Sequence, residues 1–161
     1  MGIYLNPENV DFQKSLNSEI YIDKTELIAY TNKKLNTEQG YICVSRPRRF
    51  GKSMAANMLT AYYSRGCDSR GLFQGLKIAT HPDFEKYLNQ YNVIHLNMRD
   101  YLTESENMKQ LIQFVEDDLL DELQQEFSDL RMPRRKTLVK VLEQAFAQYK
   151  IPFVFIIDEW D

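Results

Sequence analysis

The stretch SRPRRFGKS, residues 45–53, ends in three residues whose chemistry suits a phosphate group. Gly51 lets backbone N–H groups approach the phosphates, Lys52 can reach the β and γ oxygens, and Ser53 supplies a hydroxyl for Mg²⁺. The full pattern is G-x-x-x-x-G-K-[ST], and its first glycine falls on Arg46 here. The tripeptide therefore predicts a phosphate-binding loop, and the alternative is an exposed basic turn.

The stretch FVFIIDEWD is a second place where the residue types point to phosphate chemistry. An apolar run followed by Asp158 and Glu159 has the pattern of a Walker B strand. In that pattern Asp158 holds Mg²⁺, usually through water, and Glu159 polarises the water that attacks the γ-phosphate. The alternative is a buried strand that ends in surface acids.

Three continuous apolar runs predict the strands that must carry these residues. They cover residues 40–45, 92–98 and 151–161. Because each run is apolar throughout, we expect strands buried on both faces of a mostly parallel sheet. Residues 1–20 are polar and turn-rich and are expected to form an irregular lead-in.

Helices are expected around these strands, which indicates an α/β protein. Helical patterns begin near residue 21, directly after the loop at residues 52–65, and near residue 80. Residues 104–130 predict a long acidic amphipathic helix, and residues 137–150 predict another. The apolar positions of the long helix are Met108, Leu111, Ile112, Val115, Leu119, Leu123 and Phe127.

Composition and charge argue against several classes of protein. The formal net charge of -3 gives no general reason to expect a nucleic-acid binder, and no apolar run approaches the length of a membrane span. The first residues lack the basic and apolar blocks of a signal peptide. Cys43 and Cys67 are too few for a secreted disulfide scaffold, so we expect reduced thiols and a cytoplasmic location.

Other candidate residues have simpler interpretations. His81 and His95 lack a metal-binding spacing, and each is expected to be structural or solvated. A short basic cluster is best explained as a solvated linker between helices, with a nucleic-acid contact as the alternative. The cluster consists of Arg131, Arg134, Arg135 and Lys136.

Four stretches together resemble a known family. EIYIDKTELI, YICVSRPRRFGKSMAANML, GLFQGLKI and FVFIIDEWD are similar to the AAA-ATPase-like family of bacterial proteins. The resemblance runs over nearly the whole chain, and the SRPRRFGKS form of the loop is typical of the family. It implies ATP binding and a P-loop NTPase fold, a three-layer α/β/α arrangement with a mostly parallel sheet. In many relatives a PD-(D/E)XK nuclease-like domain follows the ATPase region.

The resemblance assigns roles to single residues. Lys52 would contact the phosphates, Gly51 would allow close backbone approach, and Ser53 would bind Mg²⁺. Asp158 is then the second metal residue. Glu159 is the catalytic residue that activates water, and Lys52 is the catalytic cation.

The residues around the tripeptide have less defined roles. Arg48 and Arg49 are candidates for nucleotide contact, with solvation or partner contact as alternatives, and Phe50 and Met54 complete the expected nucleotide-binding set. Residues 21–25 are expected to lie against the adenine, as such a lead-in does in related ATPases. The alternative for residues 21–25 is a helix cap.

The expected function is an ATP-binding, Mg²⁺-dependent P-loop ATPase module, a switch or motor part of a larger protein. The alternative is a nucleotide-binding or interaction fragment without turnover; a P-loop kinase is disfavoured by the Asp158-Glu159 pair.

The fold class places residues 93–98 beside the Asp158 strand and a further strand between the two motif strands. That further strand would follow Asp161, so residues 1–161 read as one domain truncated after Walker B. Three outcomes are expected: the motif strands pair directly, a second copy in a homo-oligomer donates a strand, or the edge stays open. We favour an incomplete or oligomer-completed sheet, with ATP hydrolysis absent or very slow in residues 1–161 alone.

Overall fold

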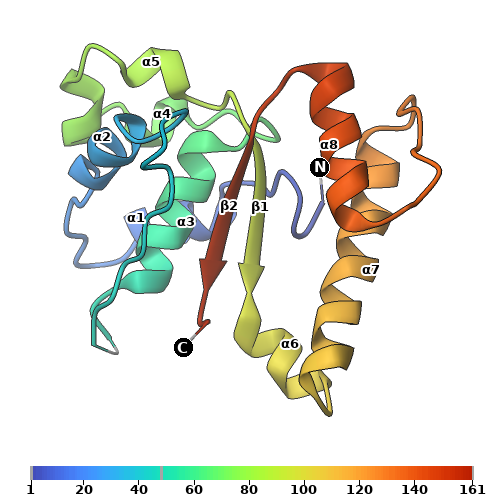
Figure 1. Ribbon diagram of the computed structural model, residues 1–161. Helices are drawn as coiled ribbons and strands as arrows, with labels where there is room; N and C mark the ends of the chain where they lie inside the picture. Colours follow the sequence, from blue (N-terminus) through green and yellow to red (C-terminus); the bar gives the residue numbers. More distant parts are fainter. Residues whose placement is uncertain (1, 48, 161) are drawn as a thin grey trace.

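The structure is a computed structural model that describes residues 2–47 and 49–160. It is a mixed α/β arrangement in which helices lie on both sides of two strands (Figure 1). The elements in chain order are α1 (Val10–Leu16), α2 (Glu26–Asn32), α3 (Lys52–Tyr63), α4 (Arg70–Phe73), the 3-10 turn η1 (Lys77–Thr80), α5 (Phe84–Tyr87), β1 (Asn92–Asn97), α6 (Met98–Glu104), α7 (Met108–Glu126), α8 (Leu138–Tyr149) and β2 (Phe153–Asp158).

The two strands β1 and β2 form a parallel sheet. Asn92 pairs with Phe153 at one end and Asn97 pairs with Asp158 at the other. The prediction that residues 93–98 lie beside the Asp158 strand is therefore confirmed. Helices α6, α7 and α8 connect the two strands along the chain, as a crossover between parallel strands requires.

The N-terminal segment covers the other edge of β1. Leu5 forms an antiparallel bridge with Ile94, and the N–H of His95 donates to the carbonyl oxygen of Tyr4 at 2.9 Å. Together with α1, this pairing shows that the expectation of an irregular lead-in over residues 1–20 was wrong. Polar, turn-rich composition does not reveal a pairing partner that lies far along the chain.

Two apolar clusters pack against opposite faces of the sheet. In β1, the side chain of Val93 joins one cluster, whereas Ile94 and Leu96 join the other, as expected from the alternation of side chains along a strand. The first cluster lies among α1, α2 and α3 and includes Phe12, Ile28, Met58, Tyr62 and Phe73. The second lies among α6, α7 and α8 and includes Tyr101, Leu111, Leu119, Leu123 and Val141.

Burial on both faces is confirmed for β1 and wrong for β2. Val154 and Ile156 of β2 pack against the first cluster, but Phe155 and Ile157 are each 50% exposed. The helices of the second cluster lie on the β1 side of the sheet and leave this part of β2 uncovered (Figure 1). An apolar run therefore predicts a strand, but it does not predict how much of that strand the neighbouring helices cover.

The strand expected over residues 40–45 is not formed. Residues 41–47 lie outside the helices and strands of the structure, and Tyr41 is 98% exposed. In the part of the chain that the structure describes, β2 pairs with β1 alone, so the direct pairing of the two motif strands does not occur. An apolar run becomes a buried strand only beside a hydrogen-bonding neighbour, and residues 41–47 have no such strand neighbour in the described chain.

The helix expected over residues 104–130 is α7, which is shorter than expected at both ends. Asn107 begins α7, because its side-chain oxygen accepts from the N–H of Gln110 at 3.0 Å, while the Gln110 side chain accepts from the N–H of Glu106. Of the seven predicted apolar positions, Met108 and Ile112 are exposed. The helix expected to begin near residue 80 is the single turn α5.

Candidate functional site

Gly51 forms the start of α3, the helix that follows the predicted phosphate loop. Its backbone is left-handed, with φ 79° and ψ 29°, a conformation that glycine adopts without steric penalty. A Cβ atom at this position would also lie 2.9 Å from Nζ of Lys24. The left-handed conformation is the reason that favours glycine here, because the Lys24 ammonium ends a flexible side chain that can move aside.

The first turn of α3 carries the two polar residues of the tripeptide. Lys52 and Ser53 are its first two residues; Lys52 is half-buried and Ser53 is exposed. The first N–H groups of a helix have no partner within the helix, and the helix dipole makes this end attractive to anions. The prediction of a helix directly after the loop is confirmed, and its N-terminus has the character of an anion site.

The residues around the tripeptide are open to solvent. Arg48 lies outside the described residues. Arg49 is exposed with a positive φ of 68°, which is uncommon for a non-glycine residue, and Phe50 is 60% exposed. Met54, on the first turn of α3, is 40% exposed.

Asp158 and Glu159 lie at the carboxyl end of β2. Asp158 is half-buried, and its Oδ1 atom accepts from the N–H of Glu159 at 2.9 Å. Glu159 is also half-buried and has a positive φ of 54°. The carboxyl end of β2 and the N-terminus of α3 lie at the same end of the molecule, and α3 packs against β2 (Figure 1).

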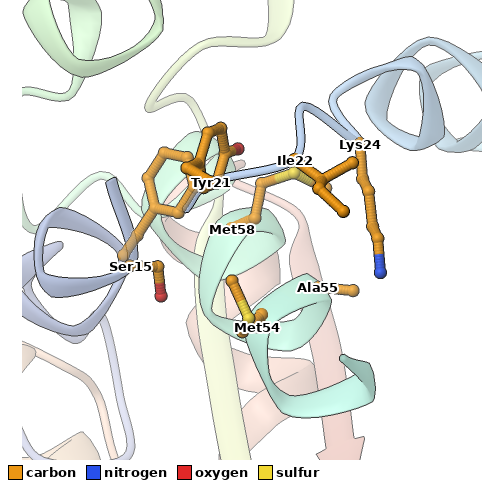
Figure 2. Close-up of a pocket in the computed structure, with 8 residues that line it drawn as sticks. Ser15, Tyr21, Ile22, Lys24, Met54, Ala55 and Met58 are labelled. Carbon is orange, nitrogen blue, oxygen red and sulfur yellow. The ribbon is translucent and has the colours of Figure 1, made fainter. Parts of the chain in front are cut away.

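A shallow, mostly apolar pocket lies beside the first turns of α3. It is formed by α1, by the segment before α2 and by α3, as Figure 2 shows. The pocket-lining residues are Phe12, Ser15, Tyr21, Ile22, Lys24, Met54, Ala55 and Met58. The structure thus brings residues 21–24 next to the helix of the predicted loop.

The helix-cap alternative for residues 21–25 finds little support in the contacts. Thr25 occupies the N-cap position of α2, but its side chain makes no capping hydrogen bond. Its Oγ1 atom instead donates to the carboxylate of Asp23 and accepts from the N–H of Ile78.

The chain matches a known protein family. The family described as predicted AAA-ATPase matches residues 10–161. The chain belongs to the AAA-ATPase-like family. Comparison with curated proteins gave no match, and comparison with solved structures gave none either. Membership of the AAA-ATPase-like family implies a P-loop fold and a nucleotide ligand.

The sequence predicted that Ser53 and Asp158 bind Mg²⁺. Among the residues that the structure describes, no group of three or more His, Cys, Asp or Glu side chains is placed to hold one. The oxygens of Ser53 and Asp158 are nevertheless the hard ligands that Mg²⁺ prefers, and Mg²⁺ commonly binds through one or two protein oxygens with phosphate and water completing its shell. The two residues therefore fit Mg²⁺ by donor chemistry.

Two other candidates take no part in this site. The basic cluster of residues 131–136 is an exposed connection between α7 and α8, and the N–H of Arg131 donates to the side chain of Gln148 at 3.0 Å. His81 lies 3.1 Å from a carboxylate oxygen of Glu26.

Within residues 2–47 and 49–160, no helix has both the length and the apolar character to cross a membrane.

The sequence patterns did not identify the Lys24 side chain as a candidate functional group. Its Nζ atom donates to the carbonyl oxygen of Phe50 at 3.0 Å, next to Gly51. The only signal in the sequence was its place within the EIYIDKTELI stretch, where it was treated as part of a backbone segment.

Proposed function

We propose that this chain binds ATP at the N-terminus of α3 and belongs to a P-loop ATPase of three-layer α/β/α architecture. The observation that carries the proposal is the left-handed Gly51, which opens a 12-residue helix at the same end of the molecule as the carboxyl end of β2, the strand that ends at Asp158. This arrangement supports a site where backbone N–H groups and one lysine face phosphate while a carboxylate lies nearby.

The residues of the tripeptide have distinct tasks in this proposal. The N–H groups at the start of α3 bind phosphate oxygens, and the Lys52 ammonium neutralises charge on the β and γ phosphates. The Ser53 hydroxyl and the Asp158 carboxylate would hold Mg²⁺, which when bound would supply positive charge to the phosphates. Arg49 and Phe50 lie on the exposed approach to these groups.

Glu159 is the proposed catalytic carboxylate. Its place directly after Asp158 suits a residue that orients water beside the metal-binding end of β2. The adenine is proposed to lie against the surface beside α3, where Tyr21, Ile22 and Met54 offer apolar groups to a flat aromatic base. The domain is proposed to act as a switch or motor part of a larger protein.

A paired substitution tests binding and turnover separately. Lys52→Ala should abolish ATP binding measured by calorimetry, because one side chain supplies the cation for the β and γ phosphates. Glu159→Gln keeps the shape of the side chain and removes its charge, so in the larger protein ATP–Mg²⁺ should still bind while phosphate release slows at least ~100-fold. Lys33→Ala and Glu38→Gln, at exposed positions away from the site, are the matched controls.

The outcomes separate the alternatives. Unchanged ATP affinity in Lys52→Ala would contradict the phosphate loop. Binding without turnover in the unsubstituted larger protein would favour the nucleotide-binding or interaction role. Turnover that survives Glu159→Gln would leave this glutamate a surface acid.

A further inference from the structure

Lys24 joins two segments that lie 26 residues apart in the sequence. It precedes α2, and its side chain extends beside the first turns of α3 (Figure 2). Its Nζ atom donates to the Phe50 carbonyl oxygen at 3.0 Å. A lysine that bonds a backbone carbonyl next to a phosphate-binding turn is in a position to control the shape of that turn.

The backbone that carries Lys24 is firmly anchored on both sides. The Asp23 carboxylate accepts from the N–H of Thr25 at 2.8 Å, from the hydroxyl of Thr25 at 2.6 Å and from the N–H of Lys77 at 2.8 Å. Thr25 is fully buried, and its hydroxyl oxygen accepts from the N–H of Ile78 at 3.1 Å. The two side chains therefore fix residues 23–25 against η1.

The ionised form of Asp23 is the one that these bonds favour. Partial burial raises the pKa of Asp23, but the hydrogen bonds from Thr25 and Lys77 outweigh it, so the pKa lies below its ordinary value. The anchor is therefore a carboxylate at neutral pH, and Lys24 projects from a rigid base.

The planarity of the peptide group links Lys24 to the phosphate loop. In a trans peptide, the C=O and N–H groups point in opposite directions. When Lys24 holds the Phe50 carbonyl on its own side, the N–H of Gly51 must point away from Lys24. The left-handed φ of Gly51 then directs the chain into α3.

We propose that Lys24 is a positioning residue of the phosphate loop: it holds the Phe50 carbonyl so that the N–H of Gly51 is turned toward a bound phosphate. The proposal rests on the proposed function of the loop. Gly51 and the Lys24 ammonium lie close together, since a Cβ at position 51 would be 2.9 Å from Nζ of Lys24.

The test compares Lys24→Met with Lys24→Arg. Methionine has a similar length without a donor, and arginine keeps N–H donors that can reach a carbonyl. Lys33→Met, on the exposed end of α2, is the matched control. Circular dichroism and thermal unfolding of each variant show whether the fold is kept.

The first measurement uses no nucleotide. Chymotrypsin cleaves after exposed aromatic residues, and Phe50 is 60% exposed. We expect Lys24→Met to increase the cleavage rate between Phe50 and Gly51 several-fold, because the peptide group is no longer held. Lys24→Arg and Lys33→Met should keep the rate of the unsubstituted chain.

The second measurement is ATP affinity by calorimetry. Lys24→Met should weaken binding by about tenfold, the lower end expected for a hydrogen bond to a charged group. Lys24→Arg should restore most of the affinity, and Lys33→Met should leave it unchanged.

Each result either supports or overturns the proposal. Folded Lys24→Met with unchanged cleavage and unchanged affinity overturns it, and so does increased cleavage with unchanged affinity in a chain that binds ATP. If the unsubstituted chain does not bind ATP, the proposed function fails, while the cleavage rate still decides whether Lys24 holds the Phe50 peptide.

Discussion

His95 is the residue whose burial has the clearest consequence for pH dependence. It lies on β1, and its Nδ1 atom is 3.0 Å from the hydroxyl oxygen of Thr60 on α3. Burial lowers the pKa of His95, and the opposing influence of Asp158 and Asp11 does not compensate. The folded protein therefore favours the neutral imidazole.

The lowered pKa of His95 predicts a loss of stability in mild acid. The unfolded chain binds more protons than the folded chain below the unfolded pKa of about 6.5, so the free energy of unfolding decreases as the pH falls through this region. His95→Gln keeps a neutral partner for Thr60 and removes the titration. We expect the melting temperature of the unsubstituted protein to fall more steeply than that of His95→Gln between about pH 7.5 and about pH 5.5.

His81→Gln is the control for this measurement, since the sequence has two histidines. A flatter pH dependence in His95→Gln than in His81→Gln assigns the effect to His95. Equal declines in the unsubstituted protein and in His95→Gln would contradict the buried neutral imidazole.

The N-terminal segment is an element held in place by one side chain of α7. The Glu122 carboxylate accepts hydrogen bonds from the N–H groups of Ile3 at 2.8 Å, Tyr4 at 3.0 Å and Leu5 at 2.7 Å. These bonds hold the segment where Leu5 can pair with Ile94 of β1. Glu122 thus links α7 to the edge of the sheet.

Removing this carboxylate should destabilise the protein and release the segment. Glu122→Ala leaves three N–H groups without their acceptor, and we expect a loss of roughly 1–3 kcal/mol in the free energy of unfolding in urea. Faster hydrogen exchange at the amide of Leu5 should accompany the loss. Gln124→Ala, exposed on the same helix, should change neither quantity; an equal loss in both variants would assign the effect to helix α7 in general.

At the scale of the whole molecule, the two edges of the sheet differ. The N-terminal segment covers β1, whereas β2 has β1 as its one strand neighbour among the described residues. Phe155 and Ile157 are half-exposed on β2. An apolar strand that is uncovered along one edge favours association with other chains.

We expect Phe155→Thr to reduce concentration-dependent association, measured by sedimentation velocity. Threonine keeps a high strand propensity and removes the exposed ring. Val139→Thr is the matched control, because Val139 is 63% exposed on α8, away from β2. A monomeric unsubstituted chain, or an equal effect of both substitutions, would contradict association through β2.

The sequence by itself determined the features that depend on neighbouring residues. The tripeptide at residues 51–53 predicted a loop and a helix, and α3 begins at Lys52. The apolar runs predicted β1 and β2, and the P-loop fold class predicted their neighbouring places in a parallel sheet. Propensity, periodicity and capping act over a few residues, so a short stretch carries enough information for such predictions.

Only the tertiary structure decided which segments meet. The run at residues 40–45 is as apolar as the one that forms β1, but it lies exposed and forms no strand. The pairing of Leu5 with Ile94 and the bond from Lys24 to Phe50 join segments that no local pattern connects. Burial and backbone pairing depend on a partner elsewhere in the chain, and the partner is present only once the chain has folded.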